Sequence, residues 1–174
     1  MKKFLIVVDM QKDFVDGALG TPEAVAIVPA VCQKIREFDG EIFVTYDTHS
    51  ADYLNTAEGR KLPVVHCVED TPGWQLDANV AAALEGKVYT ALKKPTFGST
   101  DLPFFISTIA GEEEIAITLI GLCTDICVVS NALLLKAHFP EMTIAVDATC
   151  CAGVTPASHD AALKTMAMCQ IDIL

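Results

Sequence analysis

The sequence predicts an α/β fold, a three-layer αβα sandwich of the Rossmann-like type with a mostly parallel six-stranded sheet. Two observations predict it. Short runs of β-branched and aromatic residues alternate along the chain with stretches whose apolar residues recur at helical spacing. The first of these short runs is apolar throughout, as in a parallel strand that is buried on both faces by helices.

The elements can be assigned in order along the chain. The expected strands are Phe4–Val8, Glu41–Tyr46, Val88–Leu92, Glu114–Ile120, Met142–Val146 and Ile171–Leu174. The expected helices are Glu23–Phe38, Asp77–Leu84, Leu102–Ala110, Thr124–His138 and Pro156–Met168. Thr21 before Pro22 and Thr155 before Pro156 are typical helix starts. The rest of residues 47–86 lacks a clear period, and so long an irregular stretch is typically functional.

Length and charge narrow the class of protein. The 174 residues fit one compact domain over residues 1–174, and a composition that is 52% hydrophobic excludes disorder. The net charge of −11 argues against a protein that neutralises the phosphates of nucleic acid. No apolar run is long enough to cross a bilayer. From the charge we expect no nucleic-acid partner, and from the short apolar runs no membrane partner.

The cysteines indicate reduced thiols. Their number, seven, is odd, no CxxC pair is present, and Cys150 and Cys151 are adjacent, which argues against a disulfide framework or a zinc cluster. Asp9 and Asp13 interrupt the apolar start before a secretory signal could form, so we expect a cytoplasmic protein. Most of the cysteines are interpreted as buried packing residues: Cys32, Cys67, Cys150, Cys151 and Cys169.

Polar residues follow the expected strands at their carboxyl ends. They are Asp9, Asp47, Lys93-Lys94, the segment Gly121–Cys127, and Asp147. In a parallel α/β sheet, ligands bind beyond this edge. We therefore expect these groups to surround one cleft.

Cys127 is the candidate nucleophile, because it would lie in the first turn of a helix. Backbone N–H groups and the helix dipole there favour a thiolate, and a nearby lysine would lower the pKa of the thiol further. An aspartate within reach could take the thiol proton and later handle the protons of leaving group and water. The N–H groups of Cys123 and Cys127 could form an oxyanion hole. The alternative is that Cys127 is a small buried hydrophobe.

Three segments resemble the motifs of isochorismatase-like cysteine hydrolases of the nicotinamidase type. Gly121–Val128 reads G-L-C-T-D-I-C-V, similar to the family's G-x-x-T-[DN]-x-C-V. Val8–Phe14 resembles the opening D-x-Q-x-D-F, and Lys94–Leu102 resembles a shortened K-x-x-x-S-x-F-x-x-T-x-L. Order and spacing fit the family over essentially the whole chain. The resemblance also implies a cis peptide bond at Leu122–Cys123.

The resemblance implies a catalytic triad of Asp9, Lys94 and Cys127. Lys93 is the neighbouring alternative, but Lys94 directly precedes the Pro-Thr-Phe stretch, as the family lysine does. Because neighbours in a strand point to opposite faces, only one of the two lysines can reach the thiol.

Asp47, His49 and His66 form a second constellation. In nicotinamidases a D-x-H segment and a later histidine bind a divalent metal, so the resemblance implies these residues as ligands of zinc, iron or manganese. The fourth protein ligand stays open between Asn55 and Glu58. The alternative is that both histidines are hydrogen-bonding loop residues.

The resemblance implies that the metal holds a pyridine nitrogen and orients a carboxamide toward the thiolate. Phe14, Trp74 and Phe97 are the expected apolar walls for such a ring, although each is by default a packing residue. Two histidines outside this set, His138 and His159, lie on expected helices and are interpreted as solvent-facing or capping groups.

The function implied by the resemblance is a cysteine amidohydrolase. It would convert nicotinamide or a similar small amide to the acid and ammonia through a thioester, and would work as a homodimer or homotetramer. Two alternatives stay open. One is the same scaffold acting on isochorismate or on a carbamoyl or ureido compound, and the other is a non-catalytic relative.

Overall fold

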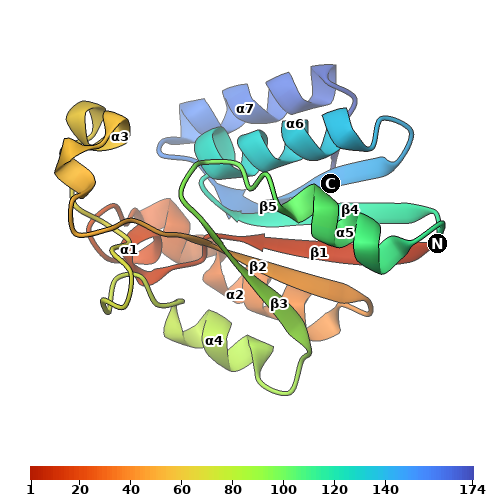
Figure 1. Ribbon diagram of the computed structural model, residues 1–174, viewed down its shortest axis with the longest axis horizontal. Helices are drawn as coiled ribbons and strands as arrows, with labels where there is room; N and C mark the ends of the chain where they lie inside the picture. Colours follow the sequence, from red (N-terminus) through yellow and green to blue (C-terminus); the bar gives the residue numbers. More distant parts are fainter.

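The computed structural model describes residues 1–174 and contains one six-stranded sheet in which every pairing is parallel. Its strands are β1 (Lys2–Val8), β2 (Glu41–Asp47), β3 (Tyr89–Lys94), β4 (Ile115–Leu122), β5 (Thr143–Ala152) and β6 (Asp172–Ile173). Their order across the sheet is β3-β2-β1-β4-β5-β6 (Figure 1). The expected α/β fold class is confirmed, and all of the sheet is parallel.

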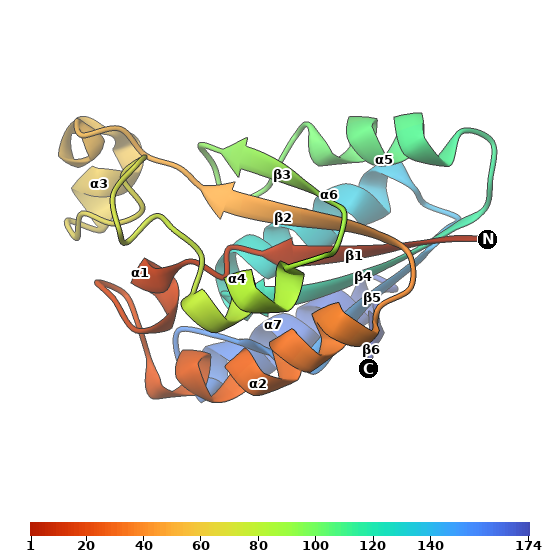
Figure 2. The same cartoon turned by 90° about the horizontal axis from the view of Figure 1, so that it is seen from below.

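Helices cover both faces of the sheet. They are α1 (Lys12–Val15), α2 (Pro22–Glu37), α3 (Ala57–Lys61), α4 (Ala78–Leu84), α5 (Leu102–Ala110), α6 (Val129–His138) and α7 (Pro156–Met168). One face packs against α5, α6 and α7, and the other against α1, α2 and α4 (Figure 2). None of the helices combines the length and the apolar character that a membrane crossing requires.

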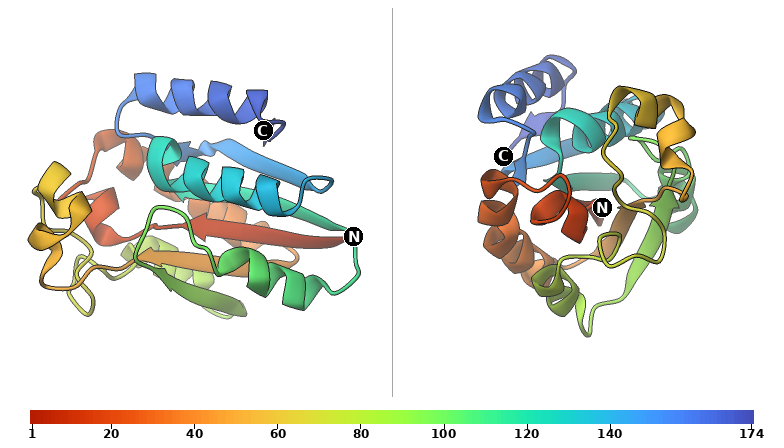
Figure 3. Two further views of the ribbon diagram at one scale, coloured as in Figure 1. Left: turned by 45° about the horizontal axis from the view of Figure 1, so that its top comes forward. Right: turned by 90° about the vertical axis from the view of Figure 1, so that its left-hand side faces the viewer.

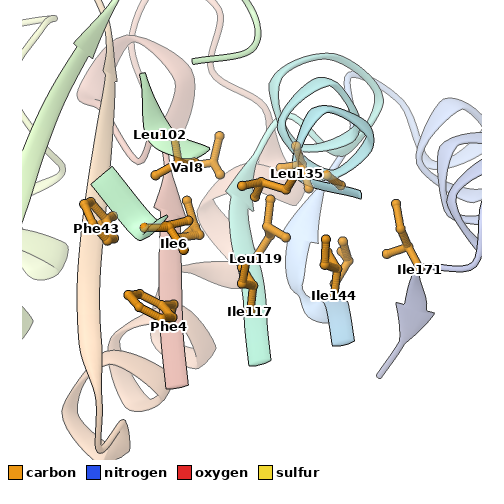
Figure 4. Packing of buried hydrophobic residues seen from close by; sticks show 14 of the residues in the cluster. Phe4, Ile6, Val8, Phe43, Leu102, Ile117, Leu119, Leu135, Ile144 and Ile171 are labelled. Atoms are coloured by element: carbon orange, nitrogen blue, oxygen red, sulfur yellow. The ribbon is translucent and has the colours of Figure 1, made fainter. Parts of the chain in front are cut away.

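The central strand β1 fills both hydrophobic cores. Phe4, Ile6 and Val8 point into the core under α5 and α6 (Figure 4), whereas Leu5 and Val7 point into the core under α2 and α4. All five side chains are fully buried. Because successive side chains alternate between faces, a continuous apolar run stabilises both layers at once, by about 1.5–3 kcal/mol for each buried side chain.

The boundaries of several elements differ from those expected. The helix expected over Thr124–His138 begins as a π-helical turn, η2 (Thr124–Val128), and α6 starts only at Val129. The irregular stretch 47–86 contains α3 and a 3-10 turn, η1 (Tyr53–Asn55), besides α4. The elements η1, α3 and α1 are three to five residues long, too short to produce a helical period in the sequence.

Asp147 does not belong to the cleft, and the expectation that it ends a strand there was wrong. Strand β5 continues to Ala152, with a shift of its register against β4. The Asp147 carboxylate instead accepts from Lys34 Nζ of α2 at 2.7 Å and from the Thr149 hydroxyl at 2.7 Å. Burial raises the pKa of Asp147, but the hydrogen bonds from Lys34 and Thr149 outweigh this effect and lower it overall.

Replacing Asp147 with asparagine is expected to lower the free energy of unfolding by about 1 kcal/mol near neutral pH, allowing for solvent screening at the partly exposed Lys34. Because the pKa of Asp147 is lower in the folded than in the unfolded chain, its ion pair stabilises the protein above about pH 4 and loses its effect as the pH falls through the folded value. Urea unfolding at about pH 7 and about pH 3 measures this. An equal difference at both pH values would contradict the prediction.

Candidate active site

The carboxyl ends of β1, β2, β3 and β4 carry the candidate residues to one edge of the sheet. Asp9 directly follows β1, Asp47 and Lys94 are the last residues of β2 and β3, and the turn with Cys127 follows β4. Strands β1 and β4 are adjacent, and the chain winds away from them in opposite directions, which is where ligands bind in such sheets. The segments with α1 and α3 lie beyond the same edge (Figure 3).

Lys94 connects three groups of the site. Its Nζ lies 2.6 Å from Asp9 Oδ2, 3.5 Å from Cys127 Sγ and 3.6 Å from Asp47 Oδ1. The side chain of Lys94 is 1% exposed, whereas Lys93 points outward and pairs with Glu69. The alternation along β3 therefore places Lys94, and not Lys93, against the thiol.

Asp9 is held rigidly at the end of β1. Its N–H donates to the Thr45 carbonyl at 3.2 Å, and the Thr45 hydroxyl donates to Asp9 Oδ1 at 2.7 Å. The other carboxylate oxygen, Oδ2, faces Lys94. One oxygen of this fully buried carboxylate thus contacts the Thr45 hydroxyl on β2, and the other contacts the Lys94 ammonium on β3.

Cys127 lies in η2, on the wall of a cavity. The peptide bond between Leu122 and Cys123 is cis, as the family resemblance implied, and no backbone carbonyl accepts from the N–H of Cys123. Gly121 is required just before this turn, because its φ is 116° and a Cβ there would lie 2.1 Å from the Val8 carbonyl oxygen.

Asn131 is a supporting residue that the sequence analysis missed. Its Nδ2 donates to the Cys127 carbonyl at 2.8 Å, and its Oδ1 accepts from the N–H of Ser99 at 2.9 Å. The buried amide thus ties the nucleophile turn to the segment after Lys94. Its position in an expected helix, four residues after Cys127, was the available signal.

Asp47, His49, His66 and Glu58 bring their ligand atoms within 4.8 Å of one another. Asp47 Oδ2 lies 3.0 Å from His49 Nε2 and 3.5 Å from His66 Nε2, and Glu58 Oε1 lies 3.7 Å from both nitrogens. Asn55 instead contacts Asp52 on the surface. The structure therefore selects Glu58 over Asn55 as the fourth donor of the set.

This donor set fits a divalent cation. The buried Asp47 Oδ1 has no hydrogen-bond partner. His66 Nδ1 shares a 2.8 Å hydrogen bond with the Val64 carbonyl, an arrangement that fixes the tautomer and leaves Nε2 free to bind a metal. Two carboxylates and two imidazoles match the preferences of zinc, iron or manganese.

The cavity beside Cys127 has a volume of about 740 Å³. Phe14 and Phe97, two of the three residues predicted as substrate walls, line the cavity. It is also lined by Asp47, His49, Glu58 and His66, which we call the metal-type cluster. Trp74 does not line it, and this expectation is corrected. The indole of Trp74 packs on Tyr46 of β2, with the ring centroids 5.1 Å apart, and donates to the Thr48 hydroxyl at 2.9 Å.

The family model of the isochorismatase domain matches residues 3–174. The chain belongs to the isochorismatase family. No curated protein matches it in sequence.

Solved structures similar to this isochorismatase-family chain are nicotinamidases and pyrazinamidases. Bacillus subtilis nicotinamidase/pyrazinamidase PncA is 26% identical with a TM-score of 0.85, and 99% of each chain is covered. The Pyrococcus horikoshii pyrazinamidase in complex with zinc is 27% identical, with a TM-score of 0.84 and coverage of 100% of this chain and 99% of that one. The Streptococcus mutans pyrazinamidase/nicotinamidase is 26% identical, with a TM-score of 0.83 and coverage of 99% and 100%.

The electrostatics of the isochorismatase-family site correct one expectation. Burial and the charge of Asp9 raise the pKa of the Cys127 thiol well above its usual range, and Lys94 offsets only part of this effect. Burial alone would lower the pKa of Lys94, but the negative groups around it raise it overall. Desolvation of the sulfur thus outweighs the opposing charge of the lysine and favours the thiol over the thiolate.

The metal-type cluster keeps one carboxylate ionised. Burial raises the pKa of Asp47, but hydrogen bonds from His49 and His66 and the charge of Lys94 lower it strongly overall. Burial and the charge of Asp47 raise the pKa of Glu58. A cation between the two carboxylates would remove the repulsion that raises the pKa of Glu58.

Two residues of the motif Val8–Phe14, Gln11 and Asp13, hold in place the segments that carry Asp47 and His66 in this family member. Gln11, fully buried, donates to the Asp47 carbonyl at 2.9 Å and accepts from the Asp47 N–H at 2.8 Å. Asp13 Oδ2 accepts from the N–H of Cys67, next to His66, at 2.8 Å. Gln11 was not among the site residues expected from the sequence, although a polar residue two positions after Asp9 in the motif was a signal.

Proposed function

We propose that this isochorismatase-family protein is a cysteine amidohydrolase that converts nicotinamide, or a similar small aromatic amide, to the acid and ammonia. The observation that carries the proposal is the contact of Lys94 with both the Asp9 carboxylate and the Cys127 thiol, on the wall of a cavity that also holds the metal-type cluster. The similarity to nicotinamidases and pyrazinamidases over nearly the full chain supports it.

Asp9 acts as the general base in the proposed reaction. It takes the proton of the Cys127 thiol as the sulfur adds to the amide carbonyl, so that a free thiolate, which the buried site disfavours, need not accumulate. The N–H groups of Cys123 and Cys127 hold the oxyanion. Asp9 returns the proton to the leaving nitrogen, ammonia departs, and a thioester on Cys127 remains.

Hydrolysis of the thioester completes the cycle. Asp9 takes a proton from the attacking water and passes it to the sulfur as the acid leaves. Throughout both steps Lys94 balances the negative charge that moves between Asp9 and Cys127, at 2.6 Å and 3.5 Å from its ammonium.

Asp47, His49, Glu58 and His66 would hold the divalent ion of the proposed enzyme. The zinc complex of the Pyrococcus horikoshii pyrazinamidase supports this assignment. When bound, such an ion supplies Lewis acidity toward a ring nitrogen or a water. Phe14, whose ring meets His66 edge-on at 5.5 Å, would then pack against an aromatic substrate beside the cluster.

The alternatives are less well supported. Cleavage of the enol ether of isochorismate does not need a thiol nucleophile or a metal, yet this chain places a thiol and four metal-type donors around one cavity. A non-catalytic relative would have no use for the buried ion pair of Asp9 and Lys94, whose assembly costs desolvation energy.

A matched amide panel tests the proposal. We expect ammonia release from nicotinamide and pyrazinamide. Release from benzamide, which lacks the ring nitrogen, should be at least about 10-fold slower. A ureido compound is included as a further comparison. Removing metal with a chelator should lower nicotinamide turnover at least about 10-fold, and added zinc or manganese should restore it. Absence of ammonia from every amide would overturn the proposal, and unchanged turnover after chelation would overturn its metal part.

A further inference from the structure

His159, in the first turns of α7, contacts the turn that contains the candidate nucleophile. Its Nδ1 and the hydroxyl of Thr124 share a hydrogen bond of 2.8 Å. Thr124 is fully buried and is the first residue of η2, the turn that contains Cys127. The half-buried His159 neither faces solvent freely nor caps a helix, so that expectation from the sequence was wrong.

The segment before α7 approaches the same turn closely. The Val154 N–H donates to both carboxylate oxygens of Asp125, at 3.1 and 3.3 Å. A Cβ on Gly153 would lie 2.8 Å from the backbone nitrogen of His159, so a glycine allows the β5–α7 connection to lie against the first turn of α7. The side chains of two consecutive residues of η2 are therefore bonded to this part of the chain, Thr124 to α7 itself and Asp125 to the connection before it.

We infer that His159 is a positioning residue, which acts through Thr124 to hold the turn that presents the Cys127 sulfur and the N–H of Cys123. The inference rests on the proposed function in treating Cys127 as the nucleophile. A π-helical turn is rare and is often found at functional sites, and here side-chain hydrogen bonds to α7 and to the segment before it hold the turn from outside. An error of about 1 Å in the sulfur position lowers the rate of attack about 100-fold.

Asparagine and glutamine, the two amino acids with an amide side chain, provide a matched pair of substitutions for His159. In His159→Asn the amide occupies the place of Nδ1 and can still bond to the Thr124 hydroxyl. In His159→Gln the amide occupies the place of Nε2, and the bond is lost with little change in side-chain volume. Thr124→Val removes the same bond from the other side, and His138→Gln, at an exposed position on α6, is the control.

Two measurements distinguish positioning from general stability. The first is kcat and KM for ammonia release, with thermal unfolding of every variant. The second is the rate of alkylation of Cys127 by iodoacetamide, followed by peptide mass spectrometry, which needs no knowledge of the substrate. We expect His159→Gln and Thr124→Val each to lower kcat and the alkylation rate about 10-fold with KM nearly unchanged. His159→Asn should keep most of both rates, and His138→Gln all of them.

The double variant His159→Gln/Thr124→Val should be no slower than either single variant, because both remove one hydrogen bond. Additive losses, or equal losses in His159→Asn and His159→Gln, would overturn the inference, as would rates equal to those of the wild type in His159→Gln. If the wild type releases no ammonia from any amide, the proposed function fails, while the alkylation rates still decide the role of His159.

Discussion

Replacing Cys127 with alanine is expected to abolish amide turnover, with a loss of at least about 10⁴-fold in kcat, because no other group can form the thioester. The fold should be preserved. The ion pair between Asp9 and Lys94 remains intact, and the loss of one buried sulfur should cost about 1 kcal/mol of unfolding free energy. Ammonia release and thermal unfolding of the variant measure the two effects.

Cys32→Ala is the matched control for this experiment. Cys32 is equally buried, but it packs in the core under α2 and does not line the cavity beside Cys127. We expect a similar small loss of stability and full turnover. If Cys127→Ala retained the activity of the wild type, the thiol would not be the nucleophile and the thioester mechanism would be wrong.

Replacing Lys94 with methionine is expected to remove activity and to destabilise the protein as well. The substitution leaves the fully buried Asp9 without its cation, and breaking a buried pair in this way costs about 3–5 kcal/mol. Turnover should fall by at least about 10³-fold, because the charge on Asp9 and the sulfur is no longer balanced. Urea unfolding and ammonia release are the measurements.

The pH dependence of this variant has a definite sign. Burial already raises the pKa of Asp9, and Lys94 opposes that rise. Without Lys94 the pKa of Asp9 rises further, so the folded chain binds a proton more tightly than the unfolded chain does. The loss of unfolding free energy in Lys94→Met is therefore smallest at pH values below about 4, the pKa of Asp9 in the unfolded chain. The loss grows as the pH rises from there to the pKa of Asp9 in the folded variant.

Two variants control the experiment on Lys94. Asp9→Asn/Lys94→Met has no buried charge left unpaired at this point, so it should recover most of the lost stability and none of the activity. Lys93→Met changes the neighbouring lysine, whose side chain is exposed on the other face of β3, and should alter neither property strongly. A fully stable and active Lys94→Met variant would contradict the role proposed for Lys94.

The sequence by itself determined the fold class and assigned Asp9, Lys94 and Cys127 to one edge of the sheet. The continuous apolar run Phe4–Val8 predicted a strand covered on both faces, as is typical of a parallel sheet between two helical layers, and the structure has this arrangement. Because the carboxyl ends of parallel strands meet at one edge, polar residues at those ends could be assigned to a common cleft. The period of a strand implied that only one of Lys93 and Lys94 could reach the thiol, and the resemblance to the family's lysine segment favoured Lys94.

The tertiary structure decided the partners and the charge states. Glu58 joins the cluster from the short helix α3, which has no detectable period, and β5 extends past Asp147 and pairs it with Lys34 instead of leaving it in the cleft. The raised pKa of the Cys127 thiol likewise depends on how completely the folded chain excludes water from the sulfur. Residue spacing encodes local conformation, whereas burial and contacts between distant segments arise only when the chain folds in three dimensions.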